Sequence, residues 1–221
     1  MKETLEKLSF CIERGKINTD SPFPRDMLKQ EGAEELIQLA INEKIPANDI
    51  LSALSLGMEK VGIKFRENKV FVPEVLMAAK AMSIAMNYLT PFFQQGIVKQ
   101  KGALVIGTVA GDLHDIGKNL VAMIIEGSGW KIIDLGTNVS TEKYLNAIEE
   151  NPDCFVGLSA LLTTTMINME KTVKAIKEKY PNIKVMIGGA PVNDELRERT
   201  GADFYSHEPL AAINYLNSCI N

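Results

Sequence analysis

The feature that most constrains the fold is a change in the spacing of apolar residues near the middle of the chain. In the first part, apolar residues recur every three or four positions in four long segments, at 4–16, 26–44, 47–65 and 72–93. This spacing predicts amphipathic helices that bury a common apolar stripe. Pro73 lies in the first turn of the last segment, where a missing N–H group costs nothing. The first part is therefore predicted to be a four-helix bundle.

The second part has a different pattern, in which short β-branched runs alternate with amphipathic segments. The runs are continuous, as in parallel strands that are covered on both faces, and they lie at 103–110, 130–136, 154–160, 184–190 and 202–206. Five strands alternating with helices predict an α/β domain of the flavodoxin-like (Rossmann-type) kind, with a five-stranded parallel sheet.

A polar link at 94–102 separates the two patterns. We place a helical bundle domain at residues 1–97 and a flavodoxin-like domain at residues 98–221, and we expect 96–102 to be a hinge. Hinges of this kind are short loop segments that absorb the backbone change when two domains move. The sequence thus predicts two domains joined by one short connection.

Composition argues against several classes of function. The formal net charge is −4 at pH 7 and no cluster of Lys and Arg stands out, so we expect no nucleic-acid partner. No run approaches the roughly 18 apolar residues of a membrane-spanning helix, and the N-terminal stretch lacks the apolar core of a signal peptide. We therefore expect no membrane partner. Cys11, Cys154 and Cys219 are odd in number and far apart, which favours free thiols in a reducing cytoplasm.

Chemically distinctive residues follow three of the predicted strands. Asp112, His114 and Gly117 follow the first strand, a Ser-Thr-rich segment begins at Ser159 after the third, and a Gly-Gly pair at 188–189 ends the fourth. Right-handed crossovers place the ends of parallel strands on one edge of the sheet, and ligands of such sheets bind at that edge. These groups are therefore expected to meet.

The residues alone leave several interpretations open. His114 can be an ordinary hydrogen-bonding side chain, the glycines a turn, and the threonines part of a strand. A phosphate-binding loop is disfavoured because the loop matches neither the G-x-x-x-x-G-K-[ST] nor the G-x-G-x-x-G pattern. A zinc site is disfavoured because His207 is the other histidine and no Cys pair accompanies it.

A metal interpretation needs a carrier for the metal. A neutral imidazole binds a transition metal through one nitrogen, and its other nitrogen needs an acceptor such as the carboxylate of Asp112. A hydroxyl such as that of Thr165 can hold that carboxylate in turn. One protein ligand does not hold a bare ion, so the ion would arrive inside a macrocycle. Gly117 and the 188–189 pair would then leave room for a long appendage.

The motifs resemble a known signature. Asp112-x-His114-x-x-Gly117, then 41 residues to Ser159-x-Leu161, then 26 residues to Gly-Gly at 188–189, is similar in order and spacing to the signature of cobalamin-binding domains. The segment 111–121 resembles cobalamin-dependent methionine synthase and the corrinoid proteins of anaerobic methyl transfer in one-carbon metabolism. The resemblance spans roughly residues 25–215.

The resemblance implies a cofactor and its ligands. The cofactor would be cobalamin or a related corrinoid in its methylcobalamin form, with His114 as the axial ligand of cobalt and Asp112 and Thr165 as a relay behind it. The nucleotide tail would run past Gly117 toward Ser159 and Gly188. Further cofactor-binding residues implied by the resemblance are Gly111, Leu113, Asp115, Ile116, Leu161, Thr163 and Gly189.

The helical stretch 57–82 is similar to the cap that covers the methyl face of the cofactor in methyl-transferring members of the family. The resemblance assigns the covering side chains to Phe65, Val72 and Val75. Two positions depart from the family pattern. Thr165 stands where methionine synthase has a serine, and Pro209 stands where that enzyme has an alanine near the tail.

The implied function is that of a methyl carrier that is not catalytic on its own. It would receive a methyl group from a substrate:corrinoid methyltransferase and pass it to a methylcorrinoid:tetrahydrofolate (or thiol) methyltransferase, and a reductive activator would restore it. Two alternatives stay open: the cobalamin-binding subunit of an adenosylcobalamin-dependent mutase, and a cobalamin-sensing regulatory protein. The second alternative lacks a visible DNA-binding signature.

Overall fold

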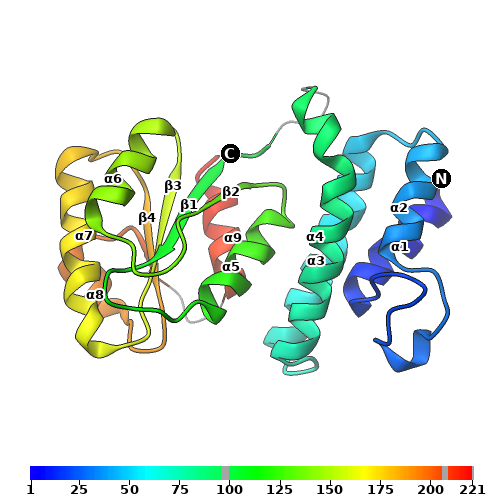
Figure 1. Cartoon of the computed structure of the whole chain (residues 1–221), viewed down its shortest axis with the longest axis horizontal. Helices are drawn as coiled ribbons and strands as arrows, with labels where there is room; N and C mark the ends of the chain where they lie inside the picture. The colour runs from blue at the N-terminus through cyan, green and yellow to red at the C-terminus, as the bar shows by residue number, and fades with distance from the viewer. Residues whose placement is uncertain (96–99, 206–208, 221) are drawn as a thin grey trace. The chain divides into compact units, whose positions relative to one another are not determined.

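The computed structural model describes residues 1–95, 100–205 and 209–220. The chain divides into two compact units, residues 1–100 with 126–129 and residues 101–125 with 130–221. Figure 1 labels the helices α1 to α9 and the strands β1 to β4. The predicted domain boundary between 97 and 98, and the first four residues of the predicted hinge, lie outside the described residues.

The helical unit consists of the predicted helices and one short 3-10 turn. Their bounds are α1 Lys2–Arg14, η1 Arg25–Met27, α2 Ala33–Asn42, α3 Ala47–Arg66 and α4 Val72–Gln94. Helix α1 packs against α2, α3 and α4, and its apolar stripe includes Leu8 and Ile12, both fully buried. The predicted four-helix region is confirmed.

The second helix begins seven residues later than predicted, at Ala33 instead of Asp26. Lys29 has a positive φ of 59°, which breaks any helical run through 26–32. The N–H of Gly32 instead donates to the Glu35 carboxylate at 2.8 Å, so Glu35 caps the start of α2. Gly32 is required there because a Cβ atom would lie 2.4 Å from the carbonyl carbon of Ile17.

The α/β unit contains a five-stranded sheet in the order β2-β1-β3-β4-β5. Every neighbouring pair is parallel, and this is the flavodoxin-like strand order, so the predicted fold class is confirmed. The strands are β1 Ala103–Thr108, β2 Lys131–Asp134, β3 Phe155–Ser159, β4 Val185–Gly188 and β5 Phe204–Tyr205. The helices are α5 Ile116–Glu126, α6 Thr141–Glu150, α7 Met166–Lys179, α8 Asp194–Thr200 and α9 Pro209–Ser218, with the 3-10 turn η2 Thr163–Thr165.

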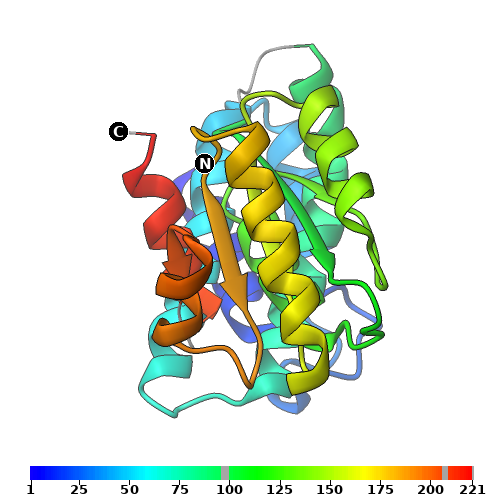
Figure 2. The same ribbon diagram turned by 90° about the vertical axis from the view of Figure 1, so that its left-hand side faces the viewer.

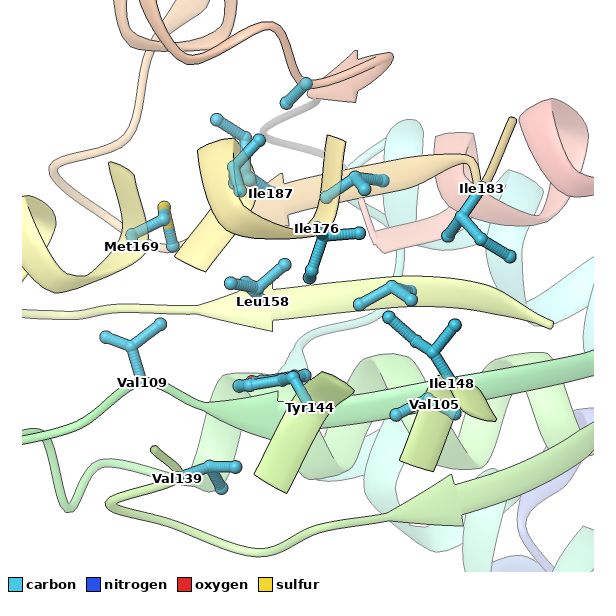
Figure 3. Packing of buried hydrophobic residues seen from close by; sticks show 14 of the residues in the cluster. Val105, Val109, Val139, Tyr144, Ile148, Leu158, Met169, Ile176, Ile183 and Ile187 are labelled. Atoms are coloured by element: carbon cyan, nitrogen blue, oxygen red, sulfur yellow. The ribbon is translucent and has the colours of Figure 1, made fainter. Parts of the chain in front are cut away.

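Side chains that alternate along the strands build one core on each face of the sheet. On one face, Val105, Leu158 and Ile187 from three strands meet Ile148 of α6 and Ile176 of α7 (Figure 3). Helix α7, drawn in yellow, runs across this face (Figure 2). All five side chains are buried, so this core fixes the sheet and holds the start of α7 near the carboxyl edge.

The other face is covered by α5 and α9. Ile106 and Met186 from the sheet pack with Ile125 of α5 and with Ala212 and Leu216 of α9. Both helices lie on this one face, and α9 is the one that contacts β5 at the edge of the sheet. The described helices include none that is both long enough and apolar enough to span a membrane.

Candidate functional site

The loop between β1 and α5 lies at the carboxyl edge of the sheet and is held by one side chain from the end of β1 and one from the segment after β2. Gly111 has φ 81°, a conformation that favours glycine, and its N–H donates to Oδ1 of Asn138 at 2.8 Å. The hydroxyl of Thr108, at the end of β1, donates to the carbonyl oxygen of His114 at 2.9 Å. The loop backbone is therefore fixed before any ligand binds.

The carboxylate of Asp112 is buried and accepts hydrogen bonds from several donors. Its Oδ1 accepts the N–H of His114 at 3.0 Å and lies 2.8 Å from Nδ1 of the same residue. Its Oδ2 accepts the N–H groups of Leu161 and Leu162 at 2.7 and 3.2 Å and the Thr165 hydroxyl at 2.8 Å. Burial by itself raises the pKa of Asp112, but these hydrogen bonds outweigh burial and hold the pKa well below its usual range. Asp112 is therefore an anion at neutral pH.

This anion determines which nitrogen of His114 faces outward. A carboxylate only accepts hydrogen bonds, so Nδ1 carries the proton and Nε2 keeps its lone pair. The side chain of His114 is 51% exposed, and among the described residues none forms a hydrogen bond with Nε2. An exposed imidazole nitrogen with a carboxylate behind it is the usual arrangement of a metal-binding histidine.

Apolar side chains surround this imidazole and are exposed. Leu113 and Ile116 flank His114 in the chain, and both are 72% exposed. Leu161 and Leu162, whose backbones hold Asp112, are 43% and 40% exposed. Exposed apolar groups concentrated around one ligand atom indicate a surface that an apolar partner covers. These exposed apolar side chains would suit a metal that is carried in a largely apolar macrocycle.

Two of the predicted glycines have open space next to them. A Cβ atom added to Gly117 or Gly188 would meet no atom within 4 Å. Gly189 differs, because its φ is +133° and an added Cβ would lie 1.8 Å from the carbonyl oxygen of Ala160. In the predicted Gly-Gly element, Gly188 therefore leaves open space, whereas Gly189 is a glycine because the backbone conformation there tolerates no side chain.

A cavity of about 250 Å³ opens beside the loop, on the face of the sheet that α5 and α9 cover. Gly117, Ser159 and Gly188 line it, and these are three residues along which the nucleotide tail was predicted to run. Ser159 and Gly188 are direct neighbours in the register of β3 and β4. The cavity therefore begins at the carboxyl edge, where the glycines leave room.

The structure brings most of the predicted site residues together in the α/β unit, and the other three belong to the helical unit. Residues 111–117, Ser159, Leu161, Thr163, Thr165 and the 188–189 pair all lie at the carboxyl edge of the α/β unit. Phe65, Val72 and Val75 belong to the helical unit. Phe65 is half-buried, Val72 is exposed and Val75 is buried. Their role in covering a cofactor stays a prediction.

Sequence reasoning missed several residues that support the site. Asn168 of α7 donates to the carbonyl oxygen of Ala110 at 2.7 Å, in addition to the contacts of Thr108 and Asn138. Lys118 is buried, and its Nζ lies 2.5 Å from Oδ2 of Asp134. The position of Lys118 directly after Gly117, in the first turn of α5, could have marked it as a residue near the site. Its burial was not predictable, because it depends on Asp134 of β2.

The donor set identifies the class of ligand. Among the described residues, no three His, Cys, Asp or Glu side chains come together to hold a metal ion, whereas one imidazole is presented by a buried carboxylate. A single nitrogen donor, an apolar surround and an adjoining cavity suit a metal that arrives in a macrocycle with a tail. A flavodoxin-like sheet with this edge defines the class of corrinoid-binding domains.

Comparison with known families agrees with this class. Two family models described as "B12 binding domain" match the chain, one over residues 102–214 and one over residues 27–90. The chain therefore belongs to the B12-binding domain family, and it binds cobalamin or a related corrinoid. Dimethylamine corrinoid protein 3 of Methanosarcina acetivorans is 35% identical over 187 residues, which are 84% of this chain and 88% of that protein.

Two solved structures have the same architecture over nearly the whole chain. A novel cobalamin-binding protein from Desulfitobacterium hafniense DCB-2 has a TM-score of 0.75 at 28% identity and covers 98% of each chain. A chain of the methanol:cobalamin methyltransferase complex from Methanosarcina barkeri has a TM-score of 0.81 at 28% identity, covering 99% of this chain and 80% of that chain. The combination of a helical region and a parallel sheet is therefore shared by these proteins.

Proposed function

We infer that this protein is a methyl-carrying corrinoid protein in which His114 binds the cobalt of the cofactor. The observation that carries this inference is the contact of 2.8 Å between Nδ1 of His114 and Asp112, on an imidazole side chain that is 51% exposed. When bound, the corrinoid supplies a cobalt centre that accepts a methyl group and gives it up again. The corrinoid and methyltransferase relatives favour this function over a mutase subunit or a regulatory protein.

Asp112 and Thr165 would set the orientation and the tautomer of His114, the residue that would hold the corrinoid metal. The Thr165 hydroxyl and two backbone N–H groups keep Asp112 ionised, and the carboxylate keeps the proton of His114 on Nδ1. The same carboxylate would hold the imidazole in one orientation whether or not a metal is bound. Asp112 keeps its negative charge throughout. Asp112 and Thr165 thus adjust the affinity of His114 for the metal and do no proton chemistry on a substrate.

The cavity is proposed to take the nucleotide tail. Gly117 and Gly188 leave open space at the carboxyl edge, and Ser159 offers a hydroxyl beside them. A tail buried in this cavity keeps the cofactor's own base away from cobalt, so His114 has access to the metal.

We also propose that residues 1–97 form a cap domain and residues 98–221 a corrinoid-binding domain. The match of a B12-binding family model to residues 27–90 supports a role for the helical unit in the same cofactor chemistry. Phe65 and Val72 have exposed surface that can cover a ligand, and Val75 supports them from the core of the unit. The cytoplasmic location expected from the sequence stays a prediction.

The proposed partners are methyltransferases. The similar chain in the methanol:cobalamin methyltransferase complex supports a substrate:corrinoid methyltransferase as the first partner. A methylcorrinoid:tetrahydrofolate or thiol methyltransferase as the acceptor enzyme, and a reductive activator, follow from the need to unload the methyl group and to restore the reduced metal. The pocket of the substrate:corrinoid methyltransferase would determine which methyl donor is used.

Labelled methyl transfer tests the proposed function. The protein is loaded with cobalamin, reduced and methylated with radiolabelled methyl iodide, and then mixed with a corrinoid-specific acceptor methyltransferase and tetrahydrofolate or a thiol. We expect about one corrinoid per chain and label in the acceptor in proportion to loaded corrinoid. Label that stays on the protein with both acceptors would contradict a carrier function.

A further inference from the structure

One row of residues crosses the sheet beneath the cavity. The strand register aligns Ile106 of β1, Gly157 of β3, Met186 of β4 and Phe204 of β5 as direct neighbours. Ile106 and Met186 pack with α5 and α9, so the row faces those helices, and all four residues line the cavity. The row forms the inner wall of the cavity.

The inner wall lies below the edge of the sheet. Ser159 and Gly188 follow Gly157 and Met186 by two residues in the same strands, which places the row about 7 Å deeper along the strands. Gly157 contributes no side chain to the row, and the side chain of Ile106 lies against it, since an added Cβ atom would be 3.2 Å from Cγ1 of Ile106. The cavity volume of about 250 Å³ is many times the roughly 10–15 Å³ that a cavity needs to hold one water molecule. This is room for a two-ring base.

The deep part of the cavity is apolar. Among the described residues that line it, the side chains of Ser159 and Lys118 alone are polar. Ser159 belongs to the edge of the sheet, and the Lys118 ammonium group is engaged by Asp134 at 2.5 Å and Asn119 at 2.6 Å. Val121 of α5 and Ala212 of α9 also line the cavity. No described side chain therefore offers a hydrogen bond to a group at the inner wall.

We propose that this cavity selects the lower base of the corrinoid, favouring an apolar fused ring of the benzimidazole type over a purine, and that Met186 is a specificity-determining residue. The proposal rests on the proposed function, because it assumes that the tail enters the cavity. A purine brings an amino group and additional ring nitrogens, and burying these polar groups without partners is unfavourable. Met186 is central because it lies between Gly157, which has no side chain, and the ring of Phe204.

The experiment compares three corrinoids on the intact protein by equilibrium dialysis with absorbance detection. The corrinoids are cobalamin, the cobamide with adenine as lower base, and cobinamide, which lacks the nucleotide. We expect cobalamin to bind roughly 10- to 100-fold more tightly than the adenine form, the range in which apolar pockets discriminate against added polar groups. Cobinamide is expected to bind more weakly than cobalamin and to keep the histidine ligand.

Variants of Met186 test the residue assignment. Met186→Gln places an amide near the inner wall, so the difference between the two bases is expected to fall below about threefold, within what one added hydrogen bond changes. Met186→Leu is the matched apolar control and is expected to keep the wild-type difference. Circular dichroism checks whether Met186→Gln folds. If it does not, Ala212→Ser is the alternative polar variant, because it adds a hydroxyl to the cavity from α9. An unchanged difference in the folded polar variants would overturn the role of the inner wall.

Failure of this proposal is distinguishable from failure of the proposed function. Equal affinity for cobalamin and the adenine form, with cobinamide bound more weakly, would mean that the cavity takes the tail without selecting the base. Equal affinity for all three would mean that the tail does not enter the cavity. Both outcomes overturn base selection while histidine ligation remains. Loss of histidine ligation with every corrinoid would instead reject the proposed function.

Discussion

Nδ1 of His114 lies 2.8 Å from Oδ1 of Asp112, and the other oxygen of that carboxylate accepts the Thr165 hydroxyl, also at 2.8 Å. The carboxylate is fully buried, whereas the imidazole is half exposed. A buried anion thus orients a surface ligand, and the residues that hold the anion belong to a different loop, after β3. The arrangement of the site therefore depends on contacts between two loops. Asp112 and Thr165, whose side chains form one of these contacts, are 53 residues apart in the sequence.

The Thr165 hydroxyl is expected to stabilise this anion. Thr165→Ala removes one charge-assisted hydrogen bond, so the free energy of unfolding should fall by about 1–3 kcal/mol. Affinity for cobalamin should also fall, by about tenfold or more, because residues behind a metal ligand affect metal affinity by roughly 10- to 100-fold. Urea unfolding and equilibrium dialysis measure the two effects.

Thr165→Ser is the matched control for this prediction. Serine keeps the hydroxyl and is the residue that the resemblance to methionine synthase leads one to expect at this position. We expect both its stability and its cobalamin affinity to lie close to those of the wild type. A serine variant as defective as the alanine variant would assign the effect to the lost methyl group and its packing.

The low pKa of Asp112 predicts a pH dependence of stability. A carboxyl group whose pKa is lower in the folded protein than in the unfolded chain, where it is about 3.9, stabilises the fold above that value. The contribution is lost as the pH falls from about 5 toward the folded pKa. Apo-protein stability measured by urea unfolding should therefore decrease over this range. Asp112→Asn should decrease less steeply, and identical slopes would contradict the predicted ionised state.

The space next to Gly117 and Gly188 allows a test that separates cofactor binding from folding. Gly117→Val and Gly188→Val add a branched side chain at positions where a Cβ atom would meet no atom within 4 Å, so the apo-protein should melt close to the wild-type temperature. Corrinoid affinity should fall at least about tenfold, since the side chain occupies the path of the tail. Differential scanning calorimetry and dialysis measure the two quantities.

Gly189→Ala is the contrasting variant. Its φ of +133° and the contact of 1.8 Å that a Cβ atom would make with Ala160 predict a loss of stability on the order of 1–3 kcal/mol or more from backbone strain alone. If the valine variants at 117 and 188 lose as much melting temperature as this variant does, the two glycines are backbone requirements and not part of a tail channel.

The sequence predicted the parts of this structure that depend on long periodic patterns. The continuous runs around Val105 and Val156 predicted buried parallel strands, and strand topology then placed His114, Ser159 and Gly188 on one edge. Such inferences succeed because the hydrophobic pattern and the handedness of crossovers act over many residues.

Other features depend on single tertiary contacts and were not predictable in this way. The start of α2 depends on the positive φ of Lys29 and on the cap formed by Glu35. The burial of Lys118 depends on Asp134 in another strand. The different roles of Gly188 and Gly189 likewise depend on Ala160, whose backbone lies close to Gly189 and not to Gly188.

The helical unit offers a test of the cap. Phe65→Ala is expected to speed the photolysis of the bound methylated cofactor, because removing the ring opens the covered face to water. Val75→Ala is the control, since Val75 is buried, and its main effect should be a loss of about 1–3 kcal/mol of stability. Photolysis under visible light and urea unfolding measure the two effects. A wild-type photolysis rate in folded Phe65→Ala would contradict the cap assignment.

The most direct test of the account is the identity of the nitrogen bound to cobalt. The protein is produced with nitrogen-15-labelled histidine, loaded with unlabelled cobalamin and reduced to the cobalt(II) form, and its electron paramagnetic resonance spectrum is recorded. We predict that each cobalt line splits into a doublet from labelled His114, and that His114→Gln loses this splitting while keeping part of the cofactor. A triplet in the labelled protein, from the unlabelled benzimidazole nitrogen of the cofactor, would contradict ligation by His114.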